Sequence, residues 1–236
     1  MQRSWSASRL GVAAALTVWA GLFWFLMLAE RTSLYYASRT DWLAPVGAIF
    51  LTIAAVGRLA SARVTVPDRL SGRQLRTLAL LVAPALLILL FPPATLGSYA
   101  VAKRSTSIKG AYVDVSGRDL STGDLSLIDI FGLRYTGDLS KLASRAGSTS
   151  SFTGFVSSLP GGGAGEFMLN RFMISCCPGD AVNIQLRVVG APPGLFEDDQ
   201  WVKVTGRIYP IGKEVIVDAT EVEKVERPDR PYLNPS

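Results

Sequence analysis

Three long runs of uncharged residues near the N-terminus constrain the fold of this chain more than any other feature. They occupy residues 10–29, 42–57 and 77–102. A run of about 20 apolar residues is long enough to cross the hydrocarbon core of a bilayer, roughly 30 Å thick, as a helix. We therefore predict a membrane anchor over residues 1–102 with three transmembrane helices, at about 10–29, 42–57 and 77–92, the last ended by Pro92-Pro93.

Two of these runs admit another interpretation. The first follows Arg3 and Arg9, and a basic start before an apolar run is also typical of a cleaved secretory signal. This run is longer than the usual apolar part of a signal, and no small-residue cleavage site follows it, so an uncleaved anchor is favoured. The second run is the shortest and is also compatible with a buried or interfacial helix.

Positive charge is concentrated in the predicted anchor. Residues 1–102 carry nine Arg or Lys and three Asp or Glu, a balance of +6, whereas residues 103–236 carry fifteen and sixteen, a balance of −1. Five of the arginines lie between the second and third runs, and cytoplasmic loops are the ones enriched in Arg and Lys. This predicts a multi-pass protein of the inner (plasma) membrane, with its C-terminal domain outside the cytoplasm.

The same charge distribution bears on binding partners. The C-terminal half is nearly neutral and its lysines and arginines are scattered, so we expect no nucleic-acid binding. The arginines that flank the apolar runs are placed to meet the anionic headgroups of a lipid bilayer.

The apolar pattern changes twice after the anchor. Residues 103–150 are typical of a tether with one loosely amphipathic helical segment, broken by Gly132 and Gly137. From residue 151 the period becomes two, over five runs bounded by Gly, Pro or Asp: residues 152–159, 166–176, 182–189, 201–210 and 214–225. Gly154 and Gly206 fall inside runs, where a closed barrel must coil tightly. We predict a five-stranded OB-like β-barrel over 151–227, with a β-sandwich as the alternative, and a tail over 228–236.

The two cysteines, Cys176 and Cys177, are adjacent, and the chain has no histidine. Without His there is neither the commonest general base nor a Ser-His or Cys-His nucleophile, so we expect no enzyme activity. Pro178 and Gly179 occupy the positions that a type II turn favours. The cysteine pair is therefore predicted where a strand ends and a turn begins.

Four interpretations of the pair remain open. Free cysteines are often simply buried apolar residues. Thiolates also bind zinc, copper(I) and similar thiophilic ions, and here Asp180 is the nearest further ligand, because two sulfurs supply only half of a tetrahedral shell. A disulfide between neighbours would be strained and easily reduced. A catalytic thiol is the fourth, although the spacing of the usual redox motif is missing.

The residues around the pair resemble a known family. The string Phe-x-x-x-Arg-Phe-x-Ile-x-Cys-Cys-x-x-Asp-Ala, here residues 167–181, is similar to that of the YcgQ-like bacterial membrane proteins. Residues 154–156, 200–206 and 228–233 agree in order, and the layout of a membrane part followed by this domain is the same.

The resemblance implies a subunit that works with a separate multi-spanning permease, of a type linked to export of thiophilic species. Some relatives carry a His-rich loop between membrane runs, whereas the loop over residues 58–76 is arginine-rich here. We expect a non-enzymatic accessory subunit of a two-component permease, with Cys176, Cys177 and Asp180 as candidate ligands of zinc or another thiophilic ion. The alternative is a membrane-tethered metal or redox sensor acting through Cys176 and Cys177.

Overall fold

The computed structural model describes residues 4–65, 68–91, 95–103, 124–137, 139–212 and 214–234. Contacts between Cα atoms divide the chain into two compact units, residues 1–94 and 95–236. Pro92-Pro93 and most of the predicted tether, residues 104–123, lie outside the described residues.

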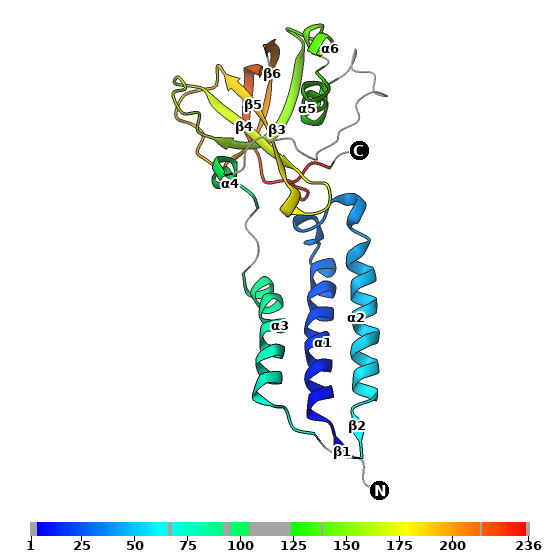
Figure 1. Ribbon diagram of the computed structural model, residues 1–236. Helices are drawn as coiled ribbons and strands as arrows, with labels where there is room; N and C mark the ends of the chain where they lie inside the picture. Colours follow the sequence, from blue (N-terminus) through cyan, green and yellow to red (C-terminus); the bar gives the residue numbers. More distant parts are fainter. Residues whose placement is uncertain are drawn as a thin grey trace. The chain divides into compact units, whose positions relative to one another are not determined.

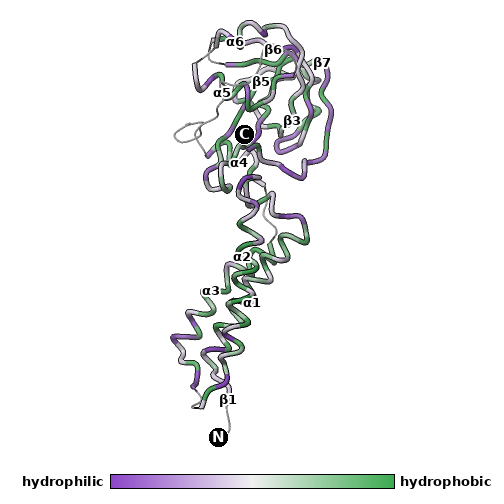
Figure 2. Tube along the Cα trace, turned by 90° about the vertical axis from the view of Figure 1, so that its right-hand side faces the viewer, coloured by the Kyte–Doolittle hydropathy of each residue, from purple (hydrophilic) through white to green (hydrophobic). Residues whose placement is uncertain are grey.

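The first unit consists of three long helices, α1 (Ala7–Leu28), α2 (Leu43–Ala60) and α3 (Gly72–Leu90). All three are long and apolar enough to cross a membrane, including the second, whose span is extended by a short 3-10 turn to Ser38–Ala60. Figure 2 shows the hydrophobic residues that run along them. The three-helix anchor is thus confirmed, and the chain has the features of a membrane protein.

Helix α1 packs against both other helices of this unit (Figure 1). Two tryptophans on α1 make polar contacts to its neighbours: Trp19 Nε1 donates to the Leu81 carbonyl of α3 at 3.0 Å, and Trp24 Nε1 donates to Thr52 Oγ1 of α2 at 3.2 Å. In an apolar medium such interhelical hydrogen bonds help to hold helices together. A two-residue pairing of β1 (Ser4–Trp5) with β2 (Arg63–Val64) joins the ends of α1 and α2.

The second unit contains a closed five-stranded barrel. Its strands are β3 (Thr149–Ser157), β4 (Phe167–Met173), β5 (Val182–Val189), β6 (Trp201–Ile211) and β7 (Glu214–Lys224), in the order β3-β4-β5-β7-β6. All neighbours are antiparallel except β5 and β7, which run parallel. The OB-like fold class is confirmed, and closure of the sheet excludes the sandwich alternative.

Alternation along the strands places the core inside the barrel. Ile184, Leu186 and Val188 of β5 point inward and are at most 2% exposed. Gly154 is also explained by closure, because a Cβ there would lie 2.5 Å from the Asn170 carbonyl oxygen on β4. The predicted role of this glycine in tight coiling is therefore confirmed.

The helical segment expected before the barrel is two helices, α5 (Leu127–Thr136) and α6 (Leu139–Ala143). Ser126 caps α5 through a reciprocal pair of hydrogen bonds with Asp129, and Gly137 ends it with a φ of 76°. Gly132, predicted to break the segment, lies inside α5, because the core contacts of its neighbours offset the low helix propensity of glycine. Core residues on both helices pack into the barrel core: Leu127, Ile130, Phe131, Leu133 and Leu142.

Candidate functional site

The cysteine pair lies in a turn between β4 and β5. Strand β4 ends at Met173, three residues earlier than the predicted run, so neither cysteine belongs to a strand. Residues Pro178–Asp180 form a single turn of 3-10 helix. Gly179 is not among the described glycines with positive φ, whereas a type II turn requires a positive φ at that position. The predicted type II turn is therefore wrong, although the turn itself is present.

The Asp180 carboxylate holds this turn in place. Its Oδ1 accepts a hydrogen bond from the Ser175 backbone N–H at 2.9 Å, and its Oδ2 accepts one from the Cys176 N–H at 2.8 Å. Farther along, the Asp180 N–H donates to the Cys177 carbonyl at 3.1 Å. The carboxylate thus provides an acceptor for two backbone N–H groups that lie beyond the end of strand β4. Asp180 therefore organises the backbone on which both thiols are carried.

The two sulfur atoms lie close together with no bond between them. The Sγ atoms are 3.5 Å apart, well beyond the roughly 2.05 Å of a disulfide bond. Cys176 is exposed and Cys177 is half-buried. One bridging atom of a thiophilic species can reach both sulfurs at this separation, after a small adjustment of the side chains.

The pair and Asp180 are together in one turn, as the sequence suggests. Within the described part of the chain, however, there is no group of three or more His, Cys, Asp or Glu side chains that could hold a metal ion. The Asp180 oxygens are engaged by the backbone. A tetrahedral ion bound at Cys176 and Cys177 would need ligands from water or from another chain, and metal binding at these three residues stays a prediction.

The electrostatics of the turn keep Cys176 protonated. The hydrogen bond to the Asp180 carboxylate, and secondly that to Cys177, raise the pKa of the Cys176 thiol from 9.0 to about 11. A negative charge beside a thiol disfavours the thiolate. Catalytic thiols are tuned in the opposite direction, with a lowered pKa. The turn is thus better suited to binding a thiophilic species that replaces the protons of the two thiols than to acting as a rapid nucleophile.

Arg171 fastens the C-terminal tail beside the cysteine turn. Its Nη2 donates to the Arg230 carbonyl at 2.9 Å and its Nε to the Pro231 carbonyl at 3.2 Å. The guanidinium carbon also lies 5.7 Å from the ring centre of Trp201. Sequence reasoning noted this arginine only as part of a motif. The signal that could have identified it was a charged residue within a largely apolar strand.

The tail itself continues the sheet next to the turn. Leu233 bridges Met173 in parallel, donating its N–H to the Phe172 carbonyl at 2.8 Å and accepting from the Ile174 N–H at 2.9 Å. Tyr232 is buried beside it. The backbone hydrogen bonds of the residues directly before the cysteines are therefore made with a segment about 60 positions later in the chain.

We expect Arg171→Leu to release this tail. The substitution keeps side-chain volume but leaves the carbonyls of residues 230 and 231 without their donor, at a cost of about 1–3 kcal/mol in the free energy of unfolding. Hydrogen exchange measured by mass spectrometry should show faster exchange over residues 231–234 and at Ile174. The matched control is Arg207→Leu, because the Arg207 side chain makes an exposed ion pair with Asp218 at 4.0 Å, a kind of contact that contributes little to stability. Equal exchange in both variants would contradict the role assigned to Arg171.

Comparison with known families supports the sequence resemblance for this unit. Residues 139–235 match the family model of the DUF1980 C-terminal domain, which covers α6, the barrel and the tail. The barrel unit is therefore similar to the DUF1980 C-terminal domain. This match fits a DUF1980/YcgQ-like family and includes the cysteine turn, Asp180 and Arg171. Neither the curated proteins nor the solved structures yield a match to the chain.

Proposed function

We propose that this chain is a non-enzymatic, membrane-anchored accessory subunit of a two-component permease. In this proposal the DUF1980 barrel lies outside the cytoplasm, docks on a multi-spanning permease, and offers Cys176 and Cys177 to a thiophilic substrate or metal ion. The single observation that carries the proposal is the pair of neighbouring thiols with Sγ atoms 3.5 Å apart on a turn fixed by Asp180.

A separate permease is part of the proposal because of the composition of the anchor. The uncharged runs at 10–29, 42–57 and 77–102 contain no ionisable Asp, Glu, Lys, Arg or His. Transport pathways commonly contain such groups within the membrane. Large apolar side chains along α2 are exposed within the first unit, among them Phe50, Ile53 and Val56. A lipid or protein neighbour is needed to cover them.

A bridging arsenical tests the thiol part of the proposal. The chain has only two cysteines, so any maleimide label identifies this turn. Phenylarsine oxide should protect both thiols of the full chain from a membrane-impermeant maleimide applied to intact cells. In that reaction two S–H bonds and the arsenic–oxygen bond break, two arsenic–sulfur bonds form, and the oxygen leaves as water, without any change of oxidation state.

Single-cysteine variants provide the control. Cys176→Ser and Cys177→Ser each retain one thiol, so both should still be labelled by the maleimide but lose protection by the arsenical. Protection that persists in the single variants would contradict a two-sulfur site. Labelling only after the cells are opened would contradict the extracytoplasmic location.

Purification of the tagged full chain from membranes tests the partner. We expect a multi-spanning permease to co-purify with the wild-type chain and with the Cys176→Ser/Cys177→Ser double variant, because docking is assigned to the barrel and not to the thiols. A chain that binds zinc or the arsenical but purifies alone would favour the sensor alternative over a permease subunit.

A further inference from the structure

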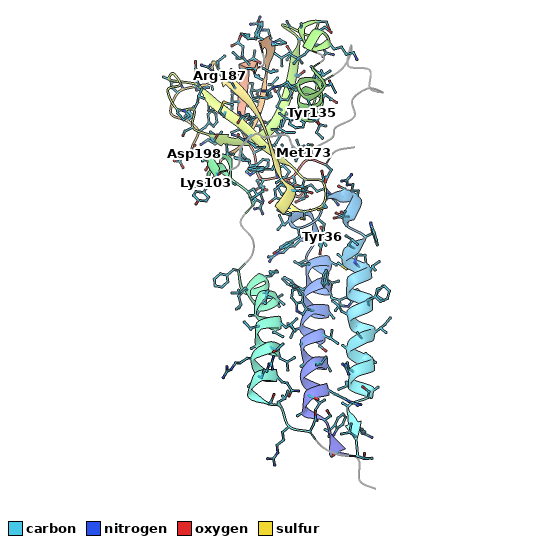
Figure 3. The ribbon with its side chains drawn as sticks, in the orientation of Figure 1. Tyr36, Lys103, Tyr135, Met173, Arg187 and Asp198 are labelled. Carbon is cyan, nitrogen blue, oxygen red and sulfur yellow. The ribbon has the colours of Figure 1, made fainter. Side chains whose placement is uncertain are left out.

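A hollow of about 690 Å3 opens on the outer face of the barrel unit. It lies over the end of β3, over β4 and β5, and beside the start of β7, with helix α4 (Ser98–Lys103) along one side. Its volume falls within the range of about 300–1,000 Å3 typical of small-molecule pockets. Figure 3 labels Arg187, Asp198 and Lys103 along this side of the barrel. The cysteine turn does not line it, so the hollow is separate from the site described above.

Two polar residues that line the hollow, Ser157 and Gln185, belong to a network of side-chain hydrogen bonds. A buried chain of hydrogen bonds runs across three strands, from Asn170 to Ser157 at 2.8 Å and from Asn183 to Asn170 at 3.0 Å. Asn183 also donates to Gln185 Oε1 at 3.3 Å. This fixes the Gln185 amide with its oxygen engaged, and no partner for its nitrogen is found among the described residues. The nitrogen is therefore a positioned donor at the hollow.

The charged groups at the hollow retain unused hydrogen-bonding capacity. Arg187 pairs with Glu166 through Nη2 at 2.7 Å, while its Nε is buried and has no partner in the described part of the chain. Asp198 accepts from the Ser158 N–H at 2.7 Å and from the Ser158 hydroxyl at 2.8 Å, both through Oδ1. For the described residues its Oδ2 is left available. A guanidinium has five N–H groups in all, so the exposed part of Arg187 keeps donors beyond the bond to Glu166.

Donors and acceptors are balanced around the opening. Arg134 and Arg187 face Asp198 and Glu214, a balance of 2 − 2 = 0 among the charged lining residues. An anion would meet two carboxylates and a cation would meet two guanidinium groups, so neither is favoured. Hydroxyl groups each donate and accept one or more hydrogen bonds, and a neutral ligand rich in them matches a lining of this kind.

One part of the rim is apolar. Tyr99 on α4 is 77% exposed and lines the hollow, as do the apolar side chains of Val101, Leu159 and Met168. An exposed aromatic side chain offers a flat apolar face with a polar tip. A sugar ring presents the complementary surfaces, C–H groups on its faces and hydroxyls around its edge. The corresponding face of other OB barrels, between the second and third strands, binds oligosaccharides or oligonucleotides.

We propose that this hollow binds one or two rings of a neutral saccharide. Gln185 Nε2 and the exposed part of the Arg187 guanidinium donate to ring hydroxyls, Asp198 Oδ2 accepts from them, and Tyr99 packs against a ring face. The assignment goes beyond the permease-subunit proposal and does not depend on it, because it uses neither the thiols nor a protein partner. Polysaccharides of a cell envelope are compatible with the location proposed for the domain.

Ligand-observed NMR of the full chain tests this assignment. The chain should be held in lipid nanodiscs, since glycoside detergents would themselves occupy a sugar site. The probes are N,N′-diacetylchitobiose and cellobiose. Each is used at about 10 mM, so that even a weak site with a Kd of about 1 mM is largely occupied. We expect saturation transfer from the protein to at least one of the two disaccharides. No transfer to either would overturn the proposal.

Variants locate the binding. Ala102→Trp, on the lining of the hollow, should abolish transfer by filling it, and Gln185→Leu should weaken binding about fivefold or more through loss of a hydrogen bond. Lys203→Leu on β6, outside the lining, should bind like the wild type. A variant is compared with the wild type only if the two have the same thermal unfolding temperature. Tyr99→Ala, on the exposed rim, is used in place of a variant that fails this criterion. Transfer that survives Ala102→Trp overturns the assignment. The assignment is also overturned if neither disaccharide binds and Ala102→Trp instead causes the loss of a protein that co-purifies with the wild type.

Discussion

Gly206→Val is expected to prevent closure of the barrel. Gly206 lies in β6 at a register shift against β7, and a Cβ added there would come 2.3 Å from the Asp218 carbonyl oxygen and 2.9 Å from Val217 Cγ1. The first of these neighbours is backbone, so relief requires separation of the two strands. We expect a loss of about 3 kcal/mol or more in the free energy of unfolding, a large part of the roughly 5–15 kcal/mol that holds a typical domain. The loss can be measured by unfolding the full chain in urea, with the protease sensitivity of the barrel as the signal of unfolding.

A second glycine provides the comparison for this prediction. At Gly163, in the loop between β3 and β4, a Cβ would find its nearest neighbour, the Glu166 side chain, at 3.7 Å, an ordinary contact. Gly163→Ala should therefore change the free energy of unfolding by about 0.5 kcal/mol or less. If Gly206→Val unfolds at the same urea concentration as Gly163→Ala, the close approach of β6 and β7 at this point is wrong.

Asp180→Asn is expected to make Cys176 more reactive. The carboxylate is the largest cause that raises the Cys176 pKa from 9.0 to about 11. Removal of its charge lowers the pKa again and increases the thiolate fraction at pH 8, by about tenfold for each unit of pKa recovered. Because the thiolate is the reacting species, alkylation of Cys176 should accelerate by about 10- to 100-fold. Asparagine keeps one oxygen able to accept a backbone N–H of the turn.

The measurement is the rate of maleimide alkylation against pH, in a Cys177→Ser background that leaves one thiol. With Asp180 present, the rate should rise about tenfold per pH unit up to the raised pKa, whereas Asp180→Asn should level off at lower pH. Glu221→Gln removes an exposed carboxylate elsewhere on the barrel and should leave the profile unchanged. Identical profiles for Asp180→Asn and its parent would show that the carboxylate does not control this thiol.

Several features of the fold follow from local sequence patterns. The bounds of β5 agree with the predicted run, Val182–Val189, because alternation with period two is visible within a short stretch of neighbouring residues. The three apolar helices were predictable for a similar reason, since length and lack of charge suffice to identify a candidate span. Glycines inside strands likewise indicated a tightly coiled sheet.

The end of β4 was not predictable in this way. Apolar alternation continues to Ile174 and Cys176, yet the strand ends at Met173, because the next backbone N–H groups go to Leu233 and to Asp180 instead of a strand neighbour. A competing partner some 60 positions away leaves no trace in a local window. The same holds for α5, whose amphipathic pattern does not show that its apolar face enters the barrel core.

Three apolar spans, a β-domain of five strands and a single place for thiol chemistry are predictable from the sequence alone, because hydropathy and alternation are properties of neighbouring residues and the cysteines can be counted directly. The folded structure was needed to show that the two thiols lie 3.5 Å apart, that Asp180 raises the pKa of one of them, and that Arg171 fastens the tail beside them. It alone also assembled the hollow near Gln185 and Arg187. Distances, hydrogen-bond partners and pKa values depend on groups that closure of the barrel brings together from distant parts of the chain.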